Sequence, residues 1–207
     1  MKVLLLNGSP NQNGCTNRAL LEVASELKKA GIETEIFWIG KKPIGGCISC
    51  KGCRTGGKCA FDDAVNVFSE LAKTADGFVF ASPVHYAAAS GNMTSFMDRL
   101  FYSSPKETFR LKPAAVVVSA RRGGTTAAYE QLLKYPGISE MPIISSRYWN
   151  MVHGSTPSDV EQDGEGLATM RVLGKNMAYF LRCREAAARA GVAMPEEEAA
   201  VRTNFIR

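Results

Sequence analysis

Four closely spaced cysteines are the residues best suited to chemistry in this sequence of 207 residues. They follow the pattern C-x2-C-x2-C-x5-C and comprise Cys47, Cys50, Cys53 and Cys59. Thiolates at such short intervals converge on one metal centre, either an iron–sulfur cluster or a zinc ion. The last gap is longer than in the bacterial ferredoxin run, and Ala60 follows where that run has proline. The remaining alternative is a metal-free loop whose cysteines stay thiols, form disulfides or act as a redox switch.

A polar loop at residues 8–17, GSPNQNGCTN, follows the first apolar run and leads into a predicted helix. Backbone N–H groups and hydroxyls at a helix N-terminus bind anions. The loop has no lysine and lacks both the nucleoside-triphosphate and the dinucleotide glycine patterns. It therefore favours a monophosphate held by neutral groups. The alternative is a polar turn in which Thr16 or Asn17 caps the helix.

A second loop, residues 82–91, has the sequence SPVHYAAASG. Pro83 stiffens this loop, its small residues let a flat ligand approach, and His85 and Tyr86 offer aromatic faces with polar tips. The alternative for His85 is an ordinary surface position. The helix that follows carries Asp98 and Arg99, which we expect to form a structural ion pair.

A third loop, residues 119–126, has the sequence SARRGGTT. Gly123 and Gly124 expose backbone N–H groups beside the charges of Arg121 and Arg122, which suits an anion. The alternative is a solvated, charged turn.

These motifs resemble the flavodoxin-like NAD(P)H-dependent FMN reductases, and the cysteine run narrows the resemblance to the iron–sulfur flavoprotein branch. It covers roughly residues 1–185 and rests on the first two loops, the Asp98 and Arg99 pair and the cysteines. The resemblance implies that the first loop holds the FMN phosphate, and that the second and third loops hold the flavin ring and ribityl chain. Cys15 stands where many relatives have Asn, so its N–H is the expected contact. The implied FMN-binding residues are Ser9, Gly14, Cys15, Thr16, Asn17, Pro83, Val84, His85, Tyr86, Arg121, Gly123 and Gly124.

The resemblance implies an oxidoreductase that passes electrons from NAD(P)H or a protein donor, through FMN, to a small-molecule or protein acceptor. The four cysteines of the run would hold a [4Fe-4S] cluster, while Cys15 and Cys183 are expected to be structural. No catalytic acid or base is required, because the cofactor carries the redox chemistry. The alternatives are a cluster-free quinone or nitro reductase and a non-enzymatic electron carrier. Carriers of this fold are usually strongly acidic, whereas the net charge here is +5.

Alternating strand and helix signals predict the elements that position these residues. Continuous apolar runs predict five strands, at residues 2–7, 33–39, 77–81, 114–119 and 141–145. Helical patterns predict helices at residues 17–30, 62–74, 91–102 and 163–190, and a further helix from the end of the third loop, after residue 126, to about residue 134. This alternation is typical of a parallel sheet covered on both faces. We therefore expect an α/β, doubly wound three-layer sandwich over residues 1–190, and the family resemblance implies that it is flavodoxin-like, with a five-stranded parallel sheet of strand order 2-1-3-4-5. Residues 191–207 are expected to form a C-terminal tail.

Composition and charge limit the kinds of binding partner that the sequence predicts. With 45% hydrophobic and 22% charged residues, the chain is not expected to be disordered, and it has no apolar run of membrane-spanning length. The charge is too small and too dispersed to predict nucleic-acid binding. The N-terminus does not resemble a signal peptide, so the cytoplasm is the expected location. The Met-rich last helix and the tail offer apolar surface, and we expect a homodimer or homotetramer with residues 148–154 near a flavin.

Overall fold

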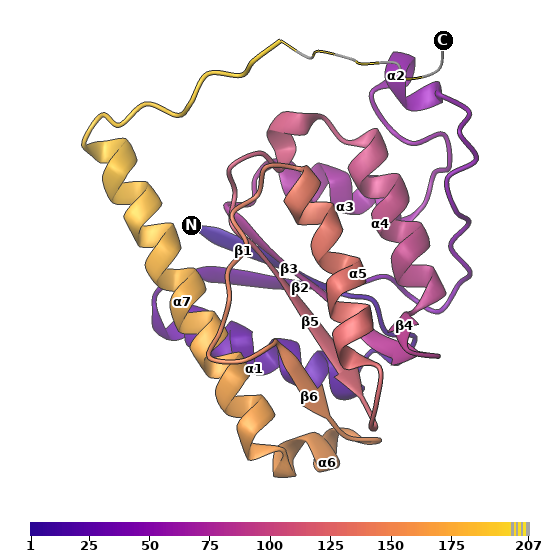
Figure 1. Cartoon of the computed structure of the whole chain (residues 1–207), viewed down its shortest axis with the longest axis vertical. Coiled ribbons are helices and arrows are strands. Elements are labelled where there is room, and N and C mark those ends of the chain that lie inside the picture. Colours follow the sequence, from indigo (N-terminus) through magenta and orange to yellow (C-terminus); the bar gives the residue numbers. More distant parts are fainter. Residues whose placement is uncertain (200, 202, 204, 206–207) are drawn as a thin grey trace.

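Five parallel strands form the central sheet of this computed structural model, which describes residues 1–199, 201, 203 and 205. The order is β2-β1-β3-β5-β6, which is the predicted order 2-1-3-4-5 once the short β4 is set aside. β4 pairs antiparallel with the end of β3 and makes a hairpin (Figure 1). The strands are β1 (Lys2–Asn7), β2 (Glu33–Trp38), β3 (Gly77–His85), β4 (Ala88–Ala89), β5 (Ala114–Ala120) and β6 (Met151–His153).

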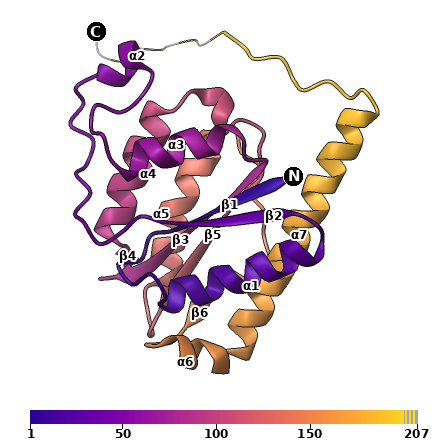
Figure 2. The ribbon, with the colours of Figure 1, turned by 180° about the vertical axis from the view of Figure 1, so that it is seen from behind.

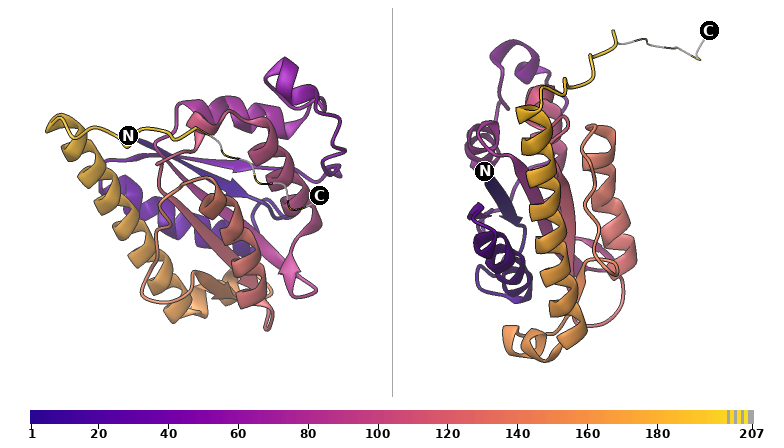
Figure 3. Two further views of the ribbon diagram at one scale, coloured as in Figure 1. Left: turned by 45° about the horizontal axis from the view of Figure 1, so that its top comes forward. Right: turned by 90° about the vertical axis from the view of Figure 1, so that its left-hand side faces the viewer.

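Helices cover both faces of the sheet, as the continuously apolar strands predict (Figure 3). Helices α1 (Cys15–Lys29) and α7 (Gly164–Arg189) pack on the face that carries Val3, Leu5 and Val79. The opposite face is covered by α3 (Ala64–Lys73), α4 (Gly91–Ser103) and α5 (Thr125–Ile138). The short elements are α2 (Gly52–Gly56), η1 (Lys106–Thr108) and α6 (Pro157–Gln162). The flavodoxin-like three-layer sandwich is therefore confirmed.

The fifth strand lies elsewhere than predicted. Residues 141–145 make only an isolated bridge, between Ile143 and Ala114, whereas β6 pairs with the last three residues of β5. Between these two points the Asn150 side-chain amide donates to the Val116 carbonyl, and the Val118 N–H donates to the Asn150 carbonyl. Pro142 has no N–H to offer a ladder, so the apolar run that contains it does not continue as a strand.

The third strand is longer than predicted. It continues through Ser82 and Pro83 to His85. Proline is tolerated there because Pro83 lies beyond Ala81, the last residue of β3 that pairs with β1. This extension carries the second loop to the edge of the sheet where β1 and β5 also end.

Two segments lie outside the sandwich. The cysteine segment, by which we mean residues 45–61 with α2 among them, follows β2. It runs along the side of the sheet that α3 and α4 cover (Figure 2). Beyond α7 the described residues 191–199, 201, 203 and 205 have no helix or strand, and the rest of the predicted tail lies outside the described residues. None of the described helices is both long enough and apolar enough to cross a membrane.

Candidate functional site

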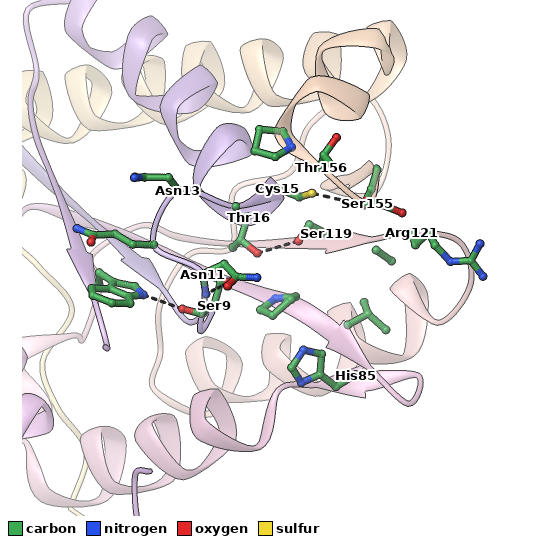
Figure 4. Close-up of a pocket in the computed structure, with 18 of the residues that line it drawn as sticks. Ser9, Asn11, Asn13, Cys15, Thr16, His85, Ser119, Arg121, Ser155 and Thr156 are labelled. Carbon is green, nitrogen blue, oxygen red and sulfur yellow. Dashed lines mark hydrogen bonds between the residues drawn. The ribbon is translucent and has the colours of Figure 1, made fainter. Parts of the chain in front are cut away.

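A cavity of about 790 Å³ opens at the carboxyl ends of β1, β3 and β5 (Figure 4). Its size falls within the range of cofactor sites, and its place is where ligands bind in open α/β sheets. The three predicted loops do meet here. The predicted residues that line it are Ser9, Gly14, Cys15, Thr16, Pro83, Val84, His85 and Arg121.

The first loop is held open by its own hydrogen bonds. The buried Asn7 side chain accepts from the Ser9 N–H at 3.0 Å and donates to the Gln12 carbonyl at 3.0 Å. The Ser9 hydroxyl accepts from the Asn11 N–H at 3.1 Å. These bonds fix the backbone of the loop around the cavity, although the loop has no glycine-rich pattern.

The helix that follows this loop begins without a side-chain cap. Its N-cap is Gly14, which makes no side-chain hydrogen bond, so the alternative of a cap from Thr16 or Asn17 is wrong. Thr16 is buried, and its hydroxyl pairs with that of Ser119 at 2.7 Å (Figure 4). Gly14, Cys15 and Thr16 all line the cavity. The first turn of α1 thus presents its backbone N–H groups and positive dipole end to the cavity.

Two lining residues come from the end of β2 and were missed by the sequence analysis. The Trp38 indole N–H donates to the Ser9 carbonyl at 2.7 Å, and the exposed Lys41 also lines the cavity. The predicted strand order was enough to identify these two residues, because β2 lies beside β1 and both strands end at the same edge of the sheet.

The β3–β4 hairpin forms another wall. Its two turn residues, Tyr86 and Ala87, have φ of 49° and 60°, a left-handed conformation that non-glycine residues rarely adopt. The hairpin is braced from behind by Gly124, whose φ is 91° and where a Cβ would lie 2.6 Å from the Ala87 Cα. Tyr86 is fully exposed. The predicted residues Asn17, Tyr86, Gly123 and Gly124 are absent from the described cavity lining.

At the mouth, Arg121 is exposed, and its guanidinium points away from Ser9 and Thr16 (Figure 4). Across from it, the N–H groups of Thr156 and Ser155 donate to Asp159 and lower the pKa of that carboxyl. Of residues 148–154, only Gly154 lines the cavity.

The thiol of Cys15, at the cavity wall, makes a hydrogen bond within the protein. Burial raises its pKa, and its Sγ lies 3.4 Å from the Gly154 carbonyl oxygen, to which the thiol donates. This contact joins the start of α1 to the loop after β6.

All four cysteines of the run border a second, small cavity, together with Phe61, Arg99 and Tyr102. Each is a free thiol. Among the described residues, no three His, Cys, Asp or Glu side chains are arranged to hold a single metal ion. A four-iron cluster takes one thiolate per iron. The donor set around this cavity fits such a cluster.

The predicted ion pair between Asp98 and Arg99 is wrong. Consecutive residues of a helix point in different directions. The Arg99 guanidinium instead binds Asp63, at 2.7 and 2.9 Å, while Asp98 accepts from the Tyr135 hydroxyl. Burial by itself would lower the pKa of Arg99, but its hydrogen bonds to Asp63 and Cys59 outweigh that effect and raise it.

Comparison with known proteins agrees with this geometry. Residues 1–156 match the family of NADPH-dependent FMN reductases. An iron–sulfur flavoprotein of Methanocaldococcus jannaschii is 32% identical, over 88% of this chain and 98% of that protein. Another iron–sulfur flavoprotein of the same organism is 30% identical, over 87% and 95% of the two chains.

Solved structures show the same fold. RosB has a TM-score of 0.70 at 16% identity, covering 100% of this chain and 92% of its own. A flavodoxin from the domain Archaea has a TM-score of 0.58 at 16% identity, covering 88% of this chain and 99% of its own.

Proposed function

This chain belongs to the NADPH-dependent FMN reductase family, and from this premise we propose that it is an FMN-dependent oxidoreductase taking electrons from NAD(P)H. We further propose that it passes them to a small-molecule or protein acceptor with the help of an iron–sulfur cluster. FMN-based oxidoreduction follows from the family itself. The donor, the cluster and the residue assignments are the parts that need testing.

The observation that carries the proposal is the uncapped first turn of α1 at the wall of the large cavity. A phosphate dianion placed there would accept hydrogen bonds from the N–H groups of Cys15 and Thr16 and would interact favourably with the helix dipole. The hydroxyl of Ser9 and the ammonium of Lys41 add further donors. This set suits the terminal phosphate of FMN.

Residues on the other walls would position the ring system. FMN supplies the redox chemistry when bound, because its ring exchanges electrons singly or in pairs. Pro83 and Val84 provide an apolar wall, and the Thr16 and Ser119 hydroxyls lie on the side of β5. Arg121, at the mouth, would attract the phosphates of a nicotinamide donor from solvent.

The cysteines would hold the second redox group. Four thiols border one cavity, and the guanidinium of Arg99 donates a hydrogen bond to the sulfur of one of them, Cys59. Relatives of similar length are named iron–sulfur flavoproteins. A cluster accepts one electron at a time, so it would let a two-electron donor serve a one-electron acceptor.

Anaerobic purification tests these assignments directly. We expect a yellow-brown protein that releases FMN, rather than FAD, on heating, contains iron and sulfide, and oxidises NADH or NADPH in steady state. Replacing Cys50 by Ser should remove iron and leave FMN in place, whereas Cys183→Ser, at an exposed cysteine outside the run, should change neither. Iron-free wild-type protein would contradict the cluster, and FAD as the main flavin would contradict the phosphate site.

Placement of the two sites favours the predicted oligomer. In Figure 1 the cysteine segment at α2 lies above the upper end of α4, whereas the hairpin at β4 lies by the lower end of α4. From Gly91 to Tyr102, α4 alone spans about 16 Å at a rise of about 1.5 Å per residue. A second copy could bring its cysteines to this cavity. Light scattering should give a homodimer or homotetramer, and a particle of about 22 kDa would contradict it.

A further inference from the structure

Arg99 is the largest fully buried side chain among the described residues, with 1% of its surface exposed. It projects from α4 into the base of the cysteine segment. Burying a guanidinium carries a large desolvation penalty unless hydrogen bonds replace its water. The groups that accept hydrogen bonds from Arg99 therefore indicate the role of this buried charge.

The five N–H donors of Arg99 are distributed over both ends of the cysteine segment. Its Nη1 donates to the carbonyl of Gly45, two residues before Cys47, at 3.3 Å. Its Nη2 donates to the carbonyl of Phe61, two residues after Cys59, at 3.4 Å, and the guanidinium lies 4.7 Å from the centre of the Phe61 ring. One side chain thus joins the start and the end of the segment.

A third donor goes to sulfur, and the other two go to Asp63. Nε of Arg99 lies 3.2 Å from Sγ of Cys59 and donates to it. Asp63 already accepts from both terminal nitrogens, at 2.7 and 2.9 Å, and neutralises the charge. Asp63 also caps α3 through the Val65 N–H, so its own position is fixed. If Arg99 served only to stabilise the fold, its ion pair with Asp63 would be sufficient. The hydrogen bond to Cys59 is an additional contact that this role does not require.

Hydrogen bonds to cysteine sulfur are one of the factors that set the reduction potential of an iron–sulfur cluster. A reduced cluster carries one more negative charge than the oxidised cluster. A hydrogen bond donated by a guanidinium N–H to a ligand sulfur therefore stabilises the reduced state more strongly than the oxidised state. The buried position of Arg99 protects this interaction from screening by salt.

We propose that Arg99 is a positioning residue for the cysteine centre, and that its hydrogen bond to Cys59 raises the reduction potential of the cluster held there. This inference rests on the proposed function, because it requires the four cysteines to bind a cluster. It gives this buried arginine a redox role that goes beyond stabilising the fold.

The test compares three variants of the full-length protein after anaerobic reconstitution with iron and sulfide. Arg99→Gln removes the charge, Arg99→Lys keeps the charge but lacks the planar fork, and Arg110→Gln removes an arginine that binds Glu140 instead. Midpoint potentials are read from redox titrations followed by electron paramagnetic resonance. Arg99→Gln should weaken the preference for the reduced state at least tenfold, about 59 mV for a one-electron couple. Arg99→Lys should shift less, and Arg110→Gln should match the wild type.

Wild-type potentials in both Arg99 variants would overturn the inference and leave the proposed function intact. A wild-type protein that binds FMN but no iron after reconstitution would overturn the cluster proposal and this inference together. If Arg99→Gln fails to fold, as judged by thermal unfolding and FMN binding, the variant Arg99→Gln with Asp63→Asn removes the unpaired carboxylate and keeps an N-cap residue. Its potential is then compared with that of Asp63→Asn alone, and equality of the two would overturn the inference.

Discussion

The indole N–H of Trp38, at the end of β2, donates a 2.7 Å hydrogen bond to the carbonyl oxygen of Ser9 in the loop after β1. The bond crosses from one parallel strand to its neighbour at the edge where the large cavity opens. It directs the Ser9 carbonyl toward the end of β2. The loop after β1 is therefore held by a residue outside its own sequence.

Replacing Trp38 by Phe should weaken FMN binding about fivefold. The substitution keeps an aromatic ring but removes a hydrogen bond worth about 1 kcal/mol. Quenching of flavin fluorescence during titration of the apoprotein measures the affinity. Trp149→Phe is the matched control, because Trp149 is half-exposed and packs on Tyr148 outside the cavity lining. Equal affinities of the two variants would contradict the role of Trp38.

Replacing Ser9 and Thr16 together by Ala should weaken FMN binding by a few kcal/mol, at about 1.5–3 kcal/mol for each hydrogen bond to a charged group. The loss should be much smaller for riboflavin, which has no phosphate. Isothermal titration with both ligands separates the two contributions. The comparison matters because Thr16 also pairs with Ser119, and damage to that contact would weaken both ligands equally.

Gly124→Ala should displace the β3–β4 hairpin, whereas Gly123→Ala should be tolerated. At φ of 91° a left-handed alanine costs about 1–2 kcal/mol. Its Cβ would also collide with Ala87, while a Cβ at Gly123 has no atom within 4 Å. Gly124→Ala should lower both the free energy of unfolding in denaturant and the affinity for flavin. Equal behaviour of the two variants would show that the hairpin does not depend on this contact.

Glu22 should make the protein sensitive to acid. Burial alone would raise the pKa of Glu22, but hydrogen bonds from Arg171 and Arg18 outweigh it and lower the pKa. A depressed carboxyl pKa stabilises the fold above the unfolded value, about 4.3, and this contribution is lost as the pH falls through the folded value. Glu22→Gln should therefore lose less stability than the wild type between about pH 7 and pH 3.5. Glu70→Gln, at an exposed pair with Lys73, is the control, and thermal unfolding across pH is the measurement.

Local sequence was sufficient for the features that depend on neighbouring residues. The polar run ending in Cys15 and Thr16 predicted an anion site at the start of α1, and the structure has an uncapped helix there. The spacing of Cys47 to Cys59 predicted a metal centre, and the four thiols border one small cavity, although no three of the described side chains are arranged to hold a single metal ion. The prediction of the fifth strand was wrong because an apolar run does not show which strand it will pair with. Pro142 also interrupts the apolar run at residues 141–145.

The sequence by itself determined the alternation of strands and helices and the polar loops after the strands. These follow from periodicity and from the rule that parallel strands end at a common edge, whereas the order of the sheet was implied by the family resemblance. Only the tertiary structure decided that Trp38 reaches Ser9, and that Arg99 leaves Asp98 for Asp63 and Cys59. Such contacts join residues 29 to 40 positions apart. They depend on how helices pack on the sheet, which no local pattern of residue types records.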